Sequence, residues 1–232
     1  MIANTTTKKK MRFLPLTDKV RQEQCTQKKL SILLQEKRCS VPVLKKLVME
    51  GMVLPPDTLD NAAKHGNLPV LRWITKSFPE MKFTNKAMDW AAEYGYLDVV
   101  IWLDYNITDF ENCTKDAMTM ALINGYYEIF FYLHNNRSEG CHDWTVDEMI
   151  RTDIDVNMVK LVTILRKEIK ITTRTIIEAI KVDNLEIIIW MYENFETEII
   201  QSSTTETDPL IFSQRHGNQQ ITDWLLERLH GE

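Results

Sequence analysis

The chain of 232 residues is poor in glycine and proline, with seven of each, and its four cysteines form no CxxC pair. Few turn-forming residues argue against a hairpin-rich β fold and favour helices. The scattered cysteines favour reduced thiols in an intracellular protein over a disulfide framework. These residues are Cys25, Cys39, Cys113 and Cys141. The composition therefore predicts an all-α protein.

Long hydrophobic runs are also missing. No stretch approaches the ~18 apolar residues that a membrane span needs. The N-terminal lysines of "MIANTTTKKKMRFLPL" precede no apolar segment of roughly 7–15 residues, as a secretory signal would require. We expect a protein that is not secreted through a standard signal peptide, with no membrane partner, in the cytoplasm or alternatively the nucleus.

Charge is unevenly distributed along the chain. Residues 1–50 carry 12 Lys and Arg against 4 Asp and Glu, whereas the remainder carries 16 against 29. The acidic body repels phosphates, which argues against a nucleic-acid platform over the whole surface. The basic front leaves one alternative open, which is binding of nucleic acid or an anionic surface through the first 50 residues. Its candidate contacts are Lys28, Lys29, Lys37, Arg38, Lys45 and Lys46.

One phrase recurs along the chain around a glycine. Gly66, Gly95 and Gly125 are spaced by 29 and 30 residues. The same period predicts about seven stacked helix-turn-helix repeats across 25–232, after a basic and flexible segment at 1–24. The repeats are anchored near 39, 66, 95, 125, 154, 183 and 217.

Apolar residues stand four, seven and eight positions after most anchors, which is one face of a helix with a period of 3.6. The column at seven holds Trp73, Trp102, Trp190 and Trp224. We expect these tryptophans in the core, and Trp90 likewise because it precedes Ala91 and Ala92. The anchor glycine ends the first helix in a left-handed conformation, so each repeat must stack on its neighbours to bury its apolar face.

Three segments resemble diverged ankyrin repeats of the type common in protists and large DNA viruses. They are "DTLDNAAKHGNLPVLRWI" (57–74), "KAMDWAAEYGYLDVVIWL" (86–103) and "DPLIFSQRHGNQQITDWL" (208–225). The resemblance implies an ankyrin-like solenoid without catalysis that holds another protein on its concave face. The repeats are shorter than the family's ~33 residues, and no Asn-Gly or Asp-Gly turn lies between them. We therefore expect irregular loops or very short hairpins there.

Two anchors depart from glycine. Ile154 is β-branched and disfavours positive φ, so the turn at this repeat is expected to differ. Asp183, followed by Asn184, tolerates the left-handed conformation better.

Aromatic residues near the anchors and in the loops are the candidate partner contacts, because such side chains dominate binding hot spots. They are His65, Tyr94, Tyr96 and Tyr126 near the anchors, and Phe83, Phe110 and Trp144 in the loops. The loop aromatics have an alternative role, packing under the neighbouring repeat.

Catalytic signatures are missing from the sequence. It contains no GxxxxGK[ST], GxGxxG, GxSxG or HExxH motif. Cys141, His142 and His134 match no standard zinc spacing. The sequence predicts a non-enzyme without metal or cofactor.

The leading hypothesis is a protein–protein interaction scaffold that binds or sequesters a partner. The resemblance adds a version in which a pathogen factor captures a host signalling protein. Self-association is a further alternative, although polar residues in the first and last repeats predict closed ends and a monomer.

Overall fold

The computed structural model describes residues 28, 30, 32, 33, 39–107, 113–152, 154–204, 207–216 and 218–230. All regular secondary structure in these residues is helical, so the all-α prediction is confirmed, and the expected irregular loops take the place of hairpins. The helices are α2 (Val41–Met49), α3 (Thr58–Lys64), α4 (Leu68–Ser77), α5 (Lys86–Glu93), α6 (Leu97–Asn106), α7 (Lys115–Ile123), α8 (Tyr127–Asn136), α9 (Thr145–Arg151), α10 (Val156–Leu165), α11 (Thr173–Lys181), α12 (Leu185–Ser202), α13 (Pro209–His216) and α14 (Gln219–His230).

The chain forms two compact units, Met1–Lys82 and Phe83–Glu232. In the first unit, α4 packs against both α3 and α2. The side-chain amide of Asn67 donates to the carbonyl of Cys39 over 2.7 Å, which ties the turn after α3 to the segment before α2. A single array over 25–232 stays a prediction.

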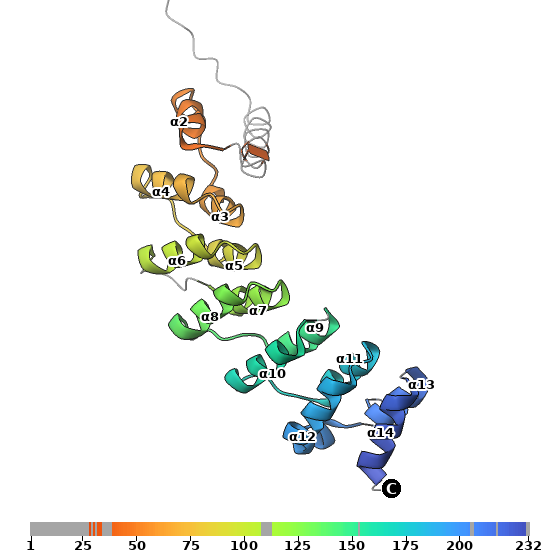
Figure 1. The fold of residues 1–232 in the computed structure, drawn as a ribbon. Coiled ribbons are helices and arrows are strands. Elements are labelled where there is room, and N and C mark those ends of the chain that lie inside the picture. Colours follow the sequence, from red (N-terminus) through yellow and green to blue (C-terminus); the bar gives the residue numbers. More distant parts are fainter. Residues whose placement is uncertain are drawn as a thin grey trace, which may run out of the picture. The chain divides into compact units, whose positions relative to one another are not determined.

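In the second unit the helices alternate between two rows (Figure 1). The first helices of the repeats, α5, α7, α9, α11 and α13, each pack on the next one, and the second helices pack on the first helix of their own repeat. Thr114, at the start of α7, bonds to Asp89 in the first half of α5. Asn124, at the end of α7, bonds to the carbonyl of Glu93 at the end of α5. Helices α5 and α7 therefore run parallel, side by side.

The turns inside the repeats share one hydrogen-bond pattern. The residue that follows each left-handed position donates its N–H to the carbonyl five residues earlier, which closes the first helix in a Schellman motif. The donors are Asn67, Tyr96, Tyr126 and Asn184. The left-handed residues before them are Gly66 (φ 66°), Gly95 (82°), Gly125 (76°) and Asp183 (55°), as predicted.

The turn between α9 and α10 is one residue longer. The N–H of Ile154 donates to Met149 over 3.1 Å, so Ile154 matches the residue after the glycine rather than the glycine itself. Asp155 then caps α10 separately, accepting from the N–H of Asn157 over 3.1 Å. Elsewhere one residue, such as Tyr126, performs both tasks. The prediction that this turn differs from the others is confirmed. The prediction that Ile154 is the anchor of this repeat is wrong by one residue, because Ile154 takes the place of the residue after the anchor.

The second helices α4, α6, α8, α10 and α12 bury a stripe at four, five and eight residues after the anchor, counted in α10 from Ile154 because its turn is one residue longer. It comprises Val70, Leu71, Ile74, Val99, Val100, Leu103, Ile129, Phe130, Leu133, Met158, Val159, Val162, Ile187, Ile188 and Met191. The predicted column at seven is wrong as a core position, because its four tryptophans are only partly buried. Three of them meet a phenylalanine at 5.6–6.1 Å between ring centroids, as Trp102 meets Phe83. An indole is too large to be buried fully at the edge of such a stripe.

Candidate functional site

Three of the predicted contact residues gather at the turns of two adjacent repeats. Tyr94 ends α5, Tyr96 caps α6 and Tyr126 caps α8. The ring of Tyr126 covers Gly95, because a Cβ at Gly95 would lie 2.5 Å from Cε1 of Tyr126. Tyr94 is 43% exposed and Tyr126 is 38% exposed. These three residues form a cluster at the C-terminal ends of α5 and α7, which we call the turn tyrosines.

The other predicted contacts lie elsewhere. Phe83 precedes α5 and packs edge-on against Trp102, and Trp144 caps α9 and stacks on His142 with 5.0 Å between ring centroids. Both are half-buried and belong to the N-terminal ends of the first helices, about 12 Å from the turns for a helix of eight residues. The predicted contacts Tyr94, Tyr96 and Tyr126 therefore lie at the C-terminal ends of the first helices, whereas Phe83 and Trp144 lie at the N-terminal ends.

His65 belongs to the first compact unit, where it ends α3. Its ring is half-buried, and burial followed by the charge of Lys64 lowers the pKa of this histidine. A neutral imidazole is therefore favoured there. Phe110 lies outside the described residues.

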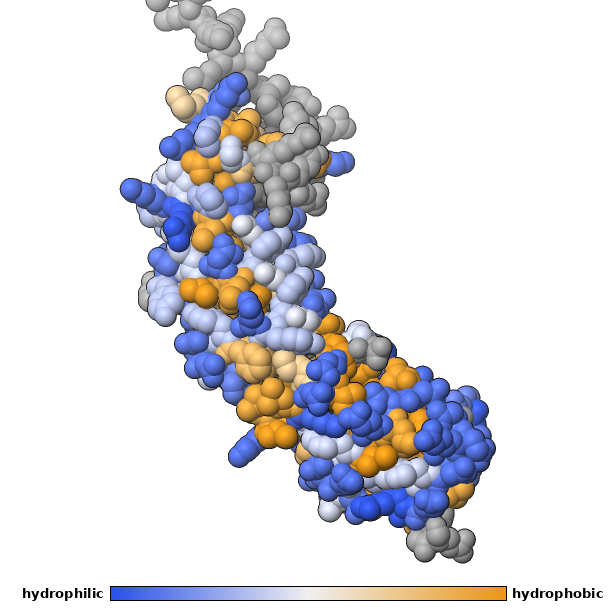
Figure 2. Space-filling view, in the orientation of Figure 1, coloured by the Kyte–Doolittle hydropathy of each residue, from blue (hydrophilic) through white to orange (hydrophobic). Residues whose placement is uncertain are grey.

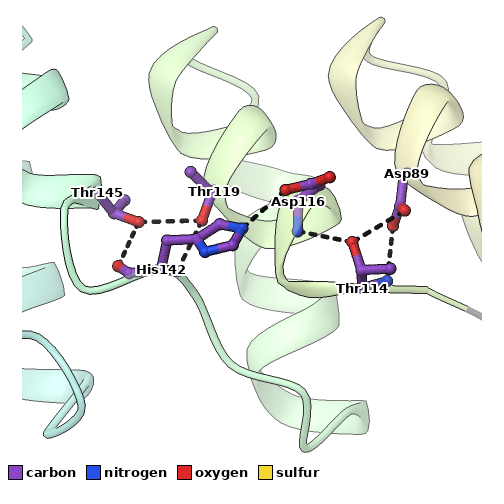
Figure 3. A network of polar contacts seen from close by, with 6 residues as sticks. All are labelled: Asp89, Thr114, Asp116, Thr119, His142 and Thr145. Atoms are coloured by element: carbon purple, nitrogen blue, oxygen red, sulfur yellow. Dashed lines mark hydrogen bonds and ion pairs between the residues drawn. The ribbon is translucent and has the colours of Figure 1, made fainter.

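A chain of polar contacts joins the N-terminal ends of the first helices (Figure 3). Thr114 caps α7, and its hydroxyl accepts from the N–H of Asp116 over 3.0 Å. Its own N–H and hydroxyl donate to the two carboxylate oxygens of Asp89 over 2.8 and 3.0 Å. Burial raises the pKa of Asp89, and the hydrogen bonds from Thr114 oppose this shift. Asp89 thus fastens the start of α7 to α5.

The next pair of first helices is joined by different side chains. The N–H of His142 donates to the hydroxyl of Thr119 over 3.0 Å, and this hydroxyl lies 3.0 Å from that of Thr145. Thr145 donates in turn to the carbonyl of His142, whose ring nitrogen lies 2.7 Å from the carboxylate of Asp116. The network holds α5, α7 and α9 in register, as Figure 3 shows.

Two buried cysteines occupy equivalent loops before α7 and α9. The N–H of Cys141 donates to Glu168 over 3.2 Å, and Arg166 holds this carboxylate by a 2.7 Å hydrogen bond. Burial, followed by nearby Glu168, raises the pKa of Cys141 to about 11. Burial and Glu139 likewise raise the pKa of Cys113 to about 12. Because the thiolate is the nucleophile, both thiols are poor nucleophiles at neutral pH.

Thiol titration checks this protection. In a Cys25→Ser variant at pH 8, we expect Cys39, Cys113 and Cys141 to resist a disulfide reagent in the native protein, since all three are buried. Unfolding in urea should release all three for reaction. Rapid modification of any of them in the native protein would contradict the assigned burial and raised pKa values.

The sequence-based prediction missed a shallow groove between α5 and α7. Its volume is about 220 Å³, and it is lined by Lys86, Asp89, Trp90, Glu93, Asp116 and Met120. Trp90 is partly exposed, so its assignment to the core is corrected. The ammonium of Lys86 lies 5.7 Å from the centroid of the Trp90 ring.

The spacing of the residues contained a signal for this groove. Lys86, Trp90 and Glu93 are four and three residues apart, which puts Trp90 on a polar face of its helix. Met120 stands four residues after Asp116 in the same way. A helical-face reading of α5 would have placed Trp90 at the surface.

A second apolar cluster lies on the other row of the second compact unit. Phe131, Leu161 and Ile164 are 37%, 38% and 64% exposed on α8 and α10. Figure 2 shows hydrophobic residues gathered over these two helices. This cluster, which we call the second-helix patch, provides control positions for tests of the groove.

The described segments contain no group of three or more His, Cys, Asp or Glu residues that could hold a metal ion. Within them, every helix is too short or too polar to cross a membrane. No known protein family model matches the chain, and no curated protein matches it either.

Proposed function

We propose that this protein is a non-catalytic scaffold that holds a segment of another protein. Its repeats are then an ankyrin-like array, and the partner lies on the exposed side of α5, α7, α9, α11 and α13, which we call the first-helix face. The parallel rows and the repeated Schellman turns support this assignment. Stacked repeats commonly bind partners along such an extended surface.

Variation along the first-helix face supports a binding role. The equivalent position, three residues before the last residue of α5, α7, α9 and α11, holds Trp90, Met120, Glu148 and Glu178. The buried stripe of the second helices repeats aliphatic side chains, whereas this position changes from aromatic to aliphatic to acidic. Packing between repeats does not require such varied side chains. Recognition of one particular partner does, because each repeat then contacts a different part of it.

The groove between α5 and α7 is the observation that carries the proposal. Trp90 and Met120 contribute apolar side chains to its lining, while Glu93 and Asp116 add carboxylates. An aromatic residue in a concave site with charged neighbours is typical of a binding hot spot. The turn tyrosines would supply further contacts at the C-terminal ends of the same helices.

Capture of partner proteins from a cell lysate tests the first-helix face. Trp90→Ala should weaken capture about 30-fold, which corresponds to the ~2 kcal/mol of a hot spot. Tyr94→Ala should weaken it less, because the groove anchors the segment. The control is Leu161→Ala on the second-helix patch, with the helical content of all variants checked by circular dichroism.

Three outcomes would contradict this function. Capture that depends equally on Leu161 would point to the second-helix patch. Capture that is unchanged in Trp90→Ala would reject the groove as the binding site. A steep decrease of binding with salt that persists in Trp90→Ala and vanishes on removal of residues 1–50 would indicate phosphate contacts through the basic front instead.

A further inference from the structure

We infer that the groove between α5 and α7 receives an arginine side chain of the bound segment. The inference depends on the proposed function, since it names the chemistry of the partner at that site. The groove is small. The groove has a volume of about 220 Å³, below the ~300–1,000 Å³ typical of small-molecule sites. A single long side chain matches this space better than a cofactor does.

The face of the Trp90 ring already accommodates a cation. The Lys86 ammonium lies 5.7 Å from the ring centroid, within the range of a cation–π contact. Lys86 is exposed and stands at the first residue of α5, so its flexible stem can swing into solvent. A planar guanidinium stacks on an indole more effectively than an ammonium does. Lys86 therefore occupies the site that an incoming arginine would take.

Carboxylates around the ring complete the recognition. Three carboxylates and one ammonium line the groove. Asp89 is engaged by Thr114 and Asp116 by His142. Among the described residues, no cation lies within ion-pair distance of the Glu93 carboxylate. Glu93 can thus form the forked pair that a guanidinium favours.

Met120 supplies the remaining contact. Its half-buried side chain lies in the same groove as Trp90, on the adjacent helix α7. The aliphatic stem of an arginine can lie along this thioether while its charged head reaches the ring and Glu93. The groove thereby matches an amphipathic cation along its length, whereas a leucine would leave the Glu93 carboxylate without a cation.

Titration of the full-length, ¹⁵N-labelled chain with N-acetyl-arginine amide tests the inference. The indole N–H signal of Trp90, assigned by its loss in Trp90→Leu, should shift and saturate. Glu93→Gln should weaken binding about fivefold. Lys86→Ala should tighten it about threefold, because the internal competitor is gone. The matched control Glu128→Gln, an exposed carboxylate on α8, should leave the affinity unchanged.

Several results would overturn the arginine preference. They are the absence of a saturable shift, an equal response to N-acetyl-leucine amide or N-acetyl-lysine amide, and weaker binding in Lys86→Ala. A preference for N-acetyl-glutamate amide would also reject it. Unchanged signals of the other indoles in each variant show that the fold is retained.

Competition separates this inference from the proposed function. Protein capture that requires Trp90 but is not inhibited by excess N-acetyl-arginine amide would reject the arginine as the bound side chain. The proposed scaffold function would still stand. Capture that does not require Trp90 would reject the scaffold assignment, whatever the amide titration gives.

Discussion

Gly95→Ala should lower the free energy of unfolding by roughly 3 kcal/mol, the sum of two separate effects. Gly95 has φ 82°, a left-handed conformation that disfavours a side chain by about 1–2 kcal/mol. Its new Cβ would also lie 2.5 Å from the Tyr126 ring. Overpacking of this kind adds about 1–3 kcal/mol. Urea denaturation followed by circular dichroism measures the change.

Gly125 provides the matched control for this substitution. Its φ is 76°, but a Cβ there would meet nothing within 4 Å. Gly125→Ala should therefore show the conformational effect alone, about 1–2 kcal/mol. Adding Tyr126→Ala to Gly95→Ala should remove the steric effect and leave a similar residual loss relative to Tyr126→Ala alone. Equal losses at the two glycines, or no relief in the double variant, would refute the close approach of Tyr126.

Asp89→Ala should destabilise the second compact unit by about 3 kcal/mol, since hydrogen bonds to a charged group contribute about 1.5–3 kcal/mol. The substitution leaves the N–H and hydroxyl of Thr114 without their acceptor at the point where α7 begins. Chemical denaturation gives the magnitude. Glu128→Ala removes an exposed carboxylate from α8 and should change stability by less than ~0.5 kcal/mol. Comparable effects of the two substitutions would show that the contact to Thr114 is unimportant.

Comparing the free energy of unfolding of the wild type and of Asp89→Asn at several pH values separates the effect of the Asp89 charge from that of its hydrogen bonds. Burial raises the pKa of Asp89 in the folded protein. The folded state then holds this proton more tightly than the unfolded state, so stability falls as pH rises from the ordinary carboxyl pKa through the raised one. The amide variant lacks this loss. The stability of the wild type relative to Asp89→Asn should therefore be greatest in acid and decline with rising pH, and an increase with pH would contradict the raised pKa.

Helix pairs and turns could be predicted because their signals are local. A left-handed glycine and an apolar period of 3.6 residues act within one repeat, and both appear in the structure at Gly66, Gly95 and Gly125. The place of the tryptophans depends on neighbouring elements instead. Trp102 stays half-buried because Phe83 covers its edge, an arrangement that no local pattern encodes.

The candidate groove illustrates the same limit. Trp90 precedes Ala91 and Ala92, which led to its prediction as a buried residue. Its neighbours on the same helix face, however, are Lys86 and Glu93. Its pairing with Met120 arises only when α7 lies parallel to α5, which requires the contacts of Asp89 and Asn124. The position of the turn tyrosines at the helix ends could be predicted because they adjoin the anchor glycines Gly95 and Gly125.

The longer turn between α9 and α10 shows where such repeats can change length. The separate cap Asp155 adds a residue, yet Met158, Val159 and Val162 remain buried on α10. An extra residue inside a helix would instead rotate everything beyond it by about 100°, because a turn takes 3.6 residues. Insertions and deletions should therefore be tolerated in the turns and not inside the helices. The spacing between anchors can then vary while the same apolar residues stay buried.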